Sequence, residues 1–294
     1  MEVSKMKNQY VGDIGDYGKY ALLRALIEKG YSVGVNWYLT PNDDKPDGKF
    51  IDYLKKNSDF LDEELFNKLK TLLITEDGNI RVENRNVTTI EESGLLKNTV
   101  FFNDMLNYEE ITANRKDYRN AWINRSIDIL GEQDIIFLDP DNGLEVKSIP
   151  PMRKNGNKYV TYEEATRYYE QARIALVIYN HRDRSSEDRY IDRFLNFYKH
   201  EGTKSCFLHR LTFQKTSVRD YIFIVKSHEY YGDIYDLLNH FAENSKKYFS
   251  VGRLPMPLVK RWALEGGTKA ITQDEYEKIQ NEYYGKLKRL RNGN

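Results

Sequence analysis

Two short apolar runs put the tightest constraint on the fold of this chain. Residues 134–138 read DIIFL and residues 175–180 read ALVIYN, and polar residues follow each run directly. An apolar run of this length without polar alternation is typical of a parallel strand that is covered on both faces. The stretches beside these runs have the apolar spacing of helices. Strands that alternate with helices predict an α/β fold with a Rossmann-like, doubly wound, mostly parallel sheet.

The rest of the chain continues this alternation. A first helix is expected over 20–27, ending at Gly30, and a β-rich run follows at 33–39. Further helices are expected near 50–54, 62–73, 117–130, 162–173 and 188–198, weaker strands at 80–82 and 99–102, and two edge strands at 205–211 and 220–226. The pattern changes after 248. We therefore expect a Rossmann-like catalytic domain over 1–248 and a mostly helical, basic C-terminal extension over 249–294.

Composition excludes several classes of protein. Hydrophobic residues make up 40% of the chain and aromatic residues 13%, so a generally disordered protein is excluded. No run approaches the roughly eighteen apolar residues of a membrane-spanning helix. The opening segment lacks the apolar stretch of a secretory signal, so a cytoplasmic location without membrane attachment is expected. Cys206 is the only cysteine, which rules out an intrachain disulfide and a thiolate metal cluster.

Charge does not identify a partner. The 45 Lys and Arg residues balance 45 Asp and Glu residues, whereas proteins that hold a duplex by neutralising its phosphates usually have a basic excess. A local basic patch can still bind nucleic acid, so composition leaves that function open. The oligomeric state is open too, because the sequence has no heptad repeat.

Polar clusters follow several of the expected strands, where an open parallel sheet binds its ligands. Turn formation and helix capping account for such residues in many proteins, but three polar groups directly after the strand at 134–138 favour a site. A carboxylate in the loop after the first strand can hold a ribose hydroxyl, an amine or a divalent cation. The candidates are Asp139, Pro140, Asp141 and Asn142 after one strand, His181 after the next, and Asp43 and Asp104 after earlier strands.

The segment Gly12–Tyr20, GDIGDYGKY, is the least ordinary part of the chain. Its three glycines at a spacing of three are expected to leave the backbone accessible, and Lys19 is expected to open the first helix. The segment is not a P-loop, because no Gly-Lys-Ser/Thr follows four intervening residues, and it is not a dinucleotide fingerprint, because no strand precedes it.

This segment resembles the G-N-x-A-D-x-x-K-H motif near the N-terminus of bacterial 23S rRNA adenine-N6 methyltransferases, a family of class I S-adenosylmethionine-dependent methyltransferases. In that family the motif precedes the first long helix and helps to form the cofactor pocket. The resemblance covers about residues 9–225 and includes an Asp-Pro pair after a strand and a Y-x-x-x-x-R-like turn at 179–184. It implies that S-adenosylmethionine is bound by a set of residues that we take to be Gly12, Asp13, Asp16 and Lys19, with Asp43 and Asp104.

The catalytic motif departs from the family pattern. Family members read D-P-P-Y, where the Asp side chain and the Pro carbonyl accept hydrogen bonds from the target amine and the aromatic ring stacks on the extruded base. This chain reads Asp139-Pro140-Asp141-Asn142, and Asn142 cannot stack. The family's glycine-rich turn after the first strand is replaced by TPNDD at 40–44. The resemblance implies methyl transfer to a nucleic acid or nucleotide, with the acceptor amine near Asp139.

Two other functions stay open. In the first, acidic residues and a histidine converge on Mg²⁺ or Mn²⁺ in a metal-dependent phosphoesterase or nuclease. The residues available for this are Asp13, Asp16, Asp139, Asp141, Glu145 and His181. In the second, the altered catalytic motif belongs to a non-catalytic binding module on a methyltransferase-like fold.

Overall fold

The computed structural model describes residues 10–41, 48, 50–56, 60–111, 113–245, 247–252 and 254. Within them one seven-stranded sheet has the order β2-β1-β3-β6-β8-β7-β9, and a separate two-stranded sheet joins β4 to β5. The strands are β1 (Val33–Asn36), β2 (Thr99–Phe102), β3 (Ile135–Leu138), β4 (Gly143–Leu144), β5 (Tyr159–Val160), β6 (Ala175–His181), β7 (Phe207–Phe213), β8 (Arg219–Val225) and β9 (Phe249–Gly252). The helices are α1 (Ile14–Glu28), α2 (Glu63–Leu73), α3 (Val87–Glu92), α4 (Arg115–Leu130), α5 (Tyr162–Gln171), α6 (Glu187–Leu195) and α7 (His228–Asn244), with short 3₁₀ turns at Asp52–Lys55, Val82–Asn84, Lys154–Lys158 and Asn196–Lys199.

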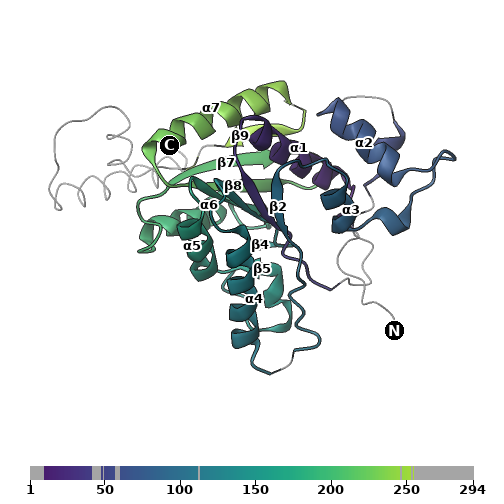
Figure 1. Ribbon diagram of the computed structural model, residues 1–294. Coiled ribbons are helices and arrows are strands. Elements are labelled where there is room, and N and C mark those ends of the chain that lie inside the picture. Colours follow the sequence, from purple (N-terminus) through teal and green to yellow (C-terminus); the bar gives the residue numbers. More distant parts are fainter. Residues whose placement is uncertain are drawn as a thin grey trace. The chain divides into compact units, whose positions relative to one another are not determined.

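The large sheet is mostly parallel. β2, β1, β3 and β6 pair in parallel, while β8 runs antiparallel between β6 and β7. β7 therefore points the same way as the four parallel strands, and β9 closes the edge in the opposite direction. Helices lie on both faces of the sheet (Figure 1). The expected α/β fold with a mostly parallel sheet between helices is confirmed.

The central strands are buried on both faces, as their apolar runs predict. Val35 and Phe137 belong to a core that β1 and β3 share with α1, α2 and α7. Ile136 and Leu138 alternate with Phe137 along β3 and are also fully buried, and successive side chains of a strand point to opposite faces. The layer with α4 and α5 covers that second face (Figure 1).

The first helix begins earlier than expected. α1 starts at Ile14, so Lys19 lies inside it instead of opening it. Asp13 is the N-cap, and its carboxylate accepts hydrogen bonds from the backbone N–H groups of Gly15 and Asp16. This cap supplies partners for N–H groups that a helix start otherwise leaves free. The glycine-containing segment is therefore mainly helical.

One expected strand and one expected domain boundary differ from the structure. The prediction of a strand at 80–82 is wrong: Ile80 makes only an isolated bridge with Ile74, and the backbone N–H of Arg81 donates to the carbonyl of Leu73 at the end of α2. β9 pairs with β7, so the sheet domain continues to Gly252, past the expected boundary at 248. The expected helical extension after that point lies outside the described residues, except for position 254.

The cysteine of the chain is enclosed in the sheet domain: Cys206 lies directly before β7 and is fully buried. No helix in the described ranges has the length and apolar character that a bilayer crossing requires.

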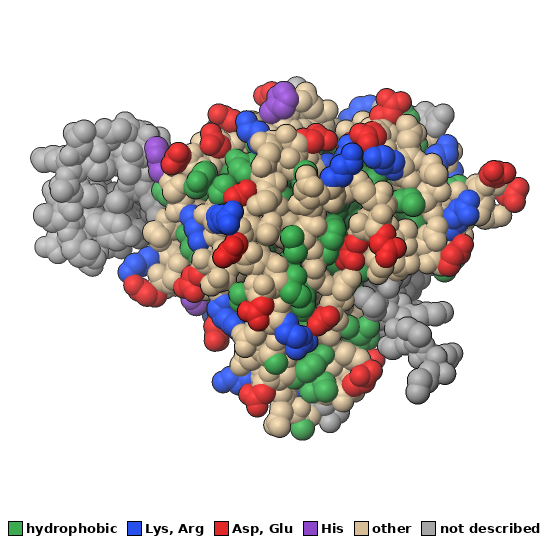
Figure 2. Space-filling view, viewed as in Figure 1, with side chains coloured by type: hydrophobic (Ala, Val, Ile, Leu, Met, Phe, Trp, Pro, Cys, Tyr) green, Lys and Arg blue, Asp and Glu red, His purple; other side chains and the backbone are tan. Residues whose placement is uncertain are grey.

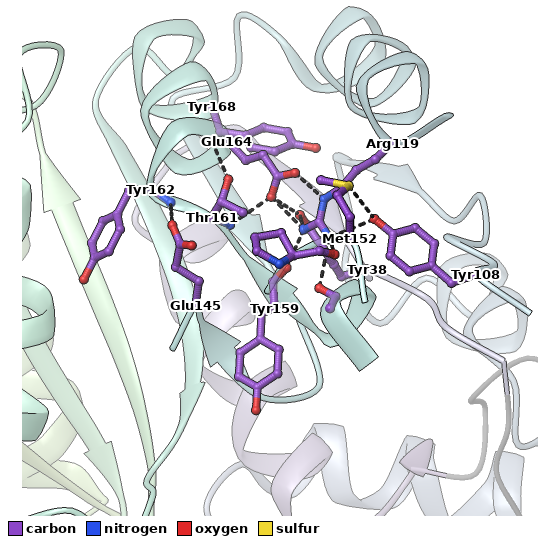
Figure 3. Close-up of polar contacts among 12 residues, drawn as sticks. Tyr38, Tyr108, Arg119, Glu145, Met152, Tyr159, Thr161, Tyr162, Glu164 and Tyr168 are labelled. Carbon is purple, nitrogen blue, oxygen red and sulfur yellow. Dashed lines mark hydrogen bonds and ion pairs between the residues drawn. The ribbon is translucent and has the colours of Figure 1, made fainter. Parts of the chain in front are cut away.

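A buried ion pair connects α4 to α5 (Figure 3). Arg119 on α4 is fully buried and donates to both carboxylate oxygens of Glu164, at 2.8 Å for Nη2 and Oε2. Glu164 also completes a capping box with Thr161 at the start of α5. Remaining guanidinium hydrogens go to the backbone carbonyls of Gly156 and Tyr159. One carboxylate thus holds a helix start and the neighbouring helix together.

The same carboxylate fixes the chain directly after β1. The hydroxyl of Tyr38 donates to Oε2 of Glu164 at 3.1 Å. Tyr38 has φ = 50°, in the left-handed region that is uncommon for a residue with a side chain. Its ring packs edge-on against Trp122 of α4, with 4.8 Å between ring centroids. These contacts hold a strained backbone turn at the carboxyl end of β1.

We predict that Glu164→Gln lowers the free energy of unfolding by about 3–5 kcal/mol, because it leaves the buried Arg119 guanidinium without its counter-charge. Urea denaturation of the purified variant measures the change. Glu163→Gln is the matched control, because Glu163 is the exposed neighbour on α5 and its loss should change stability by less than about 0.5 kcal/mol. Equal urea midpoints for Glu164→Gln and Glu163→Gln would contradict a stabilising role for the ion pair between Arg119 and Glu164.

Candidate functional site

A pocket opens at the carboxyl ends of the parallel strands. It contains about 680 Å³ of space, including open space at its mouth. Its walls come from the start of α1, from residues 37–40 after β1, from residues 139–141 after β3, and from the ends of β6 and β8 that meet there. The chain continues from β1 to one side of the sheet and from β3 to the other, so the strand order reverses between them. Open α/β sheets bind their ligands at such a switch point.

Lys19 joins α1 to the central strand inside this pocket. Its Nζ lies 2.6 Å from Oδ2 of Asp139 and 2.7 Å from Oδ1 of Asp16. The hydroxyl of Tyr20 donates to the other oxygen of Asp16 at 3.1 Å. All of these side chains are largely buried. The ammonium group therefore holds together two carboxylates that would otherwise repel each other in a region of low polarity.

Burial changes the proton affinity of this cluster. Burial raises the pKa of Asp139 to about 7, against the opposing effect of Lys19. For Lys19, burial favours the neutral form, but the carboxylates of Asp139 and Asp16 outweigh it and hold the Lys19 pKa well above its usual value. Burial, followed by the charge of Asp16, also raises the pKa of Asp13. Asp139 is therefore a group that changes charge near neutral pH.

The structure brings most of the predicted catalytic residues to this pocket. Asp139, Pro140 and Asp141 line it after β3, and His181 lines it at the end of β6. Asp141 lies 3.4 Å from the hydroxyl of Thr40 and 3.7 Å from Nζ of Lys158. Of the predicted cofactor residues, Asp13, Asp16 and Lys19 also line the pocket.

Other predicted residues lie elsewhere. Gly12 is in the turn before α1 with φ = 82°, where a side chain would collide with Leu73, and it does not line the pocket. Asn142 is also outside the lining, and its backbone N–H donates to the carbonyl of Lys158. Gly12 and Asn142 are expected in the site because they stand at motif positions of the resembled family, but the turn before α1 and the β4–β5 pairing place them outside the pocket lining.

The two remaining acidic candidates are Asp104, which does not line the pocket, and Asp43. Asp104 is about half exposed and pairs with Arg125 at 3.1 Å, because the chain after β2 turns toward α4. Asp43 lies outside the described residues.

The glycines of the first motif serve packing. Gly15 and Gly18 lie on one face of α1, where a β-carbon at position 15 would lie 1.3 Å from Nη1 of Arg219 and one at position 18 would lie 2.4 Å from the ring of Phe213. The expected accessible backbone is therefore wrong for Gly18, which Phe213 covers, whereas Gly15 packs against Arg219 and also lines the pocket. A spacing of three places residues on the same face of a helix, which is the packing signal in this motif.

Arg219 is a pocket residue that the sequence analysis missed. It is the first residue of β8 and lines the pocket beside His181, its register partner on β6. Ligand-binding residues are expected at the carboxyl ends of parallel strands, but β8 is antiparallel to β6, so its amino end lies at the same edge of the sheet. The signal that was available is the hairpin itself, since a return strand begins where the outgoing strand ends.

The acidic residues of the metal alternative do not form a cation site here. Among the residues that the structure describes, no group of three His, Cys, Asp or Glu side chains is arranged to hold a metal ion. Lys19 occupies the space between Asp16 and Asp139. Glu145 accepts a hydrogen bond from the backbone of Tyr162, away from the pocket lining.

Charge on the visible surface is mixed. On the face shown in Figure 2, basic and acidic side chains are interspersed, without a broad region of one sign. This face therefore lacks the basic stripe with which many proteins hold a nucleic-acid backbone.

We predict that Asp139 makes stability fall as the pH rises from about 4 to about 7. The unfolded chain releases this proton near the ordinary pKa of 3.8, whereas the folded protein keeps it to about pH 7. The folded state therefore binds more protons across this window, and stability declines with pH there. Urea denaturation from pH 4 to pH 8 should show that Asp139→Asn removes a decline of about 4 kcal/mol.

The control for this pH series is Asp104→Asn, which removes an exposed carboxylate. Its stability should follow the wild-type curve in parallel across the series. Parallel curves for wild type and Asp139→Asn would instead show that the pKa of Asp139 is not raised.

Comparison with protein-family models, with curated proteins and with solved structures finds no match to this chain. The pocket residues and their geometry are therefore the basis for assigning a function.

Proposed function

We propose that this chain is an S-adenosylmethionine-dependent methyltransferase that acts on an amino group of a nucleotide or nucleic acid. The observation that carries the proposal is that one pocket combines Asp16 and Lys19 of the first motif with Asp139 and Pro140 after β3. These parts are 120 positions apart in the sequence and meet through the contact between Lys19 and Asp139. The resemblance assigns the first part to the cofactor and the second to the acceptor amine.

The chemistry of the pocket wall fits a ligand with an apolar body and a charged end. Trp37, Leu39 and Val87 supply apolar surface, and the start of α1 and of β8 supplies charged groups of both signs. Among the charged groups, the guanidinium of Arg219 is buried and has nitrogen atoms without hydrogen-bond partners among the residues described. When bound, the cofactor supplies an activated methyl group, while the protein supplies orientation and electrostatics.

Asp139 and Pro140 would hold the acceptor. An ionised Asp139 carboxylate and the Pro140 carbonyl can each accept a hydrogen bond from an amine, which fixes the direction of its lone pair. Asn142 lies outside the pocket lining, so it neither stacks on a base nor blocks one. His181 lines the pocket at the end of the neighbouring strand, and an imidazole ring is one of the groups on which bases stack. We assign the stacking role to His181.

The metal-dependent phosphoesterase is less well supported. It requires several free carboxylates, whereas Asp13 caps α1 and Asp16 and Asp139 are paired with Lys19. A non-catalytic binding module predicts the same pocket and the same ligand binding, and differs only in the absence of turnover.

Calorimetric titration with S-adenosylmethionine and S-adenosylhomocysteine, with and without Mg²⁺, tests the cofactor. We expect micromolar binding of both that does not depend on the metal. Heat from Mg²⁺ or Mn²⁺ alone, together with no binding of either adenosyl compound, would favour the phosphoesterase instead. Binding of the cofactor without release of S-adenosylhomocysteine, across nucleotide and RNA or DNA acceptors, would identify the binding module.

Asp139→Ala tests the catalytic assignment. We predict that the variant loses methyl transfer by about a hundredfold or more, because a positioning and polarising contact is removed at the reacting amine, while cofactor affinity changes by less than about threefold. The release of S-adenosylhomocysteine measures transfer, and calorimetry measures binding. The control is Asp104→Ala, outside the pocket lining. An active Asp139→Ala enzyme would refute the assignment.

The pH profile gives an independent test. Burial raises the pKa of Asp139 to about 7, and only the ionised form accepts two hydrogen bonds freely. The wild-type rate should therefore rise as the pH increases from 6 to 8. A flat rate across this range would contradict a role for the ionised carboxylate.

A further inference from the structure

Arg219 enters the pocket from the strand that runs against the others. It is the first residue of β8, and its neighbours across the sheet are His181 on β6 and Phe213 on β7. Because β8 is antiparallel to β6, this first residue lies at the ligand-binding edge. The side chain lines the pocket next to the start of α1.

The guanidinium of Arg219 has too few acceptors. Arg219 is 7% exposed, and its Nε and Nη1 atoms have no hydrogen-bond partner in the part of the chain that the structure describes. The approach of Nη2 to Oδ2 of Asp13, at 3.8 Å, is beyond hydrogen-bond distance. Buried polar groups are nearly always paired, and leaving a charged donor unpaired costs more than leaving a neutral one.

Three other largely buried arginines of the sheet domain are each paired closely with a carboxylate, although Nε of Arg193 and Nε of Arg210 also have no hydrogen-bond partner among the described residues. A carboxylate oxygen lies 2.8 Å or less from a guanidinium nitrogen of Arg119, Arg193 and Arg210. Their partners come from other segments of the chain, namely Glu164, Asp183 and Glu187. Arg219 differs from them in two respects: it lines the pocket, and its carboxylate neighbour stays 3.8 Å away.

The first turn of α1 is shaped to admit this guanidinium. Gly15 lies against it, and a β-carbon there would come within 1.3 Å of Nη1. Any residue other than glycine at position 15 would therefore displace the charged group. A helix that keeps this space open for a cation without a close partner indicates that the cation has a use in that place.

The carboxylates nearest to Arg219 have partners of their own. Asp16 and Asp139 are paired with Lys19, and Asp13 accepts two hydrogen bonds from the helix start, so their charges are partly compensated. The hydroxyl of Tyr221, two residues along β8, is also buried and has no partner among the described residues. This hydroxyl is an additional hydrogen-bond donor near Arg219.

We propose that Arg219 binds an anionic oxygen group of the ligand, either a carboxylate or a phosphate, through its unpartnered Nε and Nη1 donors. A planar guanidinium with several donors in one plane matches both groups in a bidentate manner. The inference rests on the proposed function for the choice of ligands, since a carboxylate would belong to the amino-acid part of the cofactor and a phosphate to the acceptor nucleotide.

Matched ligand pairs distinguish the two sources. S-Adenosylhomocysteine and 5′-methylthioadenosine share the nucleoside and the thioether, but only the first has a carboxylate; AMP and adenosine differ by the phosphate. Calorimetry with wild type and Arg219→Gln measures all four affinities. We expect the variant to bind the anionic member of one pair about tenfold to a hundredfold more weakly, with no change for its uncharged partner. The affinity of Arg219→Lys for that anionic ligand should lie between the affinities of wild type and Arg219→Gln.

Arg210→Gln is the matched control, because Arg210 is a largely buried arginine of the neighbouring strand and lies outside the pocket lining. It should leave all four affinities as in wild type. Equal affinities of Arg219→Gln and wild type for every ligand would overturn the proposal. An equal loss for charged and uncharged ligands would also overturn it, because it would indicate a structural role for Arg219.

The experiment separates this inference from the proposed function. If wild type binds AMP but neither adenosyl thioether, the methyltransferase proposal fails, and the loss of AMP binding in Arg219→Gln still supports the anion site. If wild type binds none of the four ligands, inorganic pyrophosphate is titrated as a bare anion. Binding that Arg219→Gln abolishes supports the proposal, and no binding of pyrophosphate overturns it.

Discussion

The contact between Lys19 and Asp139 is the interaction on which the pocket depends. It joins the first helix to the central strand of the sheet across 120 positions of sequence, and it compensates carboxylates that cannot lie together unpaired in a buried region. Because the cation comes from the protein, the carboxylates can gather there without a bound metal. Burial, opposed by the charge of Lys19, raises the pKa of Asp139 to about 7, so this carboxyl group changes charge near neutral pH.

A second buried ion pair, Arg119 and Glu164, supports the part of the pocket wall that follows β1. Arg119 and Glu164 lie behind the turn that comes after β1, and through Tyr38 they fix a backbone conformation that a side chain disfavours. The two pairs have different tasks. Lys19 and Asp139 face the ligand space, whereas Arg119 and Glu164 are enclosed and hold the second face of the sheet to α5. Each pair therefore fixes one pocket-lining segment: Lys19 and Asp139 join α1 to the end of β3, and Glu164 holds Tyr38 after β1.

The sequence predicted the centre of the sheet well and its periphery less well. The strands at 134–138 and 175–180 were recognisable because burial on both faces leaves a continuous apolar run. The start of α1 was missed because Asp13 and the glycines have the composition of a loop, while their function as cap and packing surface depends on β7 and β8. Asp139 was found from its place after a strand. Arg219 was missed because only the carboxyl ends of strands were considered, whereas the β7–β8 hairpin brings the amino end of β8 to the same edge of the sheet.

The single cysteine gives this fold a chemical reporter. Cys206 is fully enclosed directly before β7, on the side of the sheet formed by the antiparallel strands. A thiol reagent can reach it only when that part of the protein opens, so the labelling rate in native buffer measures local unfolding of this segment. Because the chain has no other cysteine, the signal comes from one position. A ligand that binds the folded domain lowers the population of its open states and should slow the labelling, so one thiol allows binding to be followed without any knowledge of the reaction.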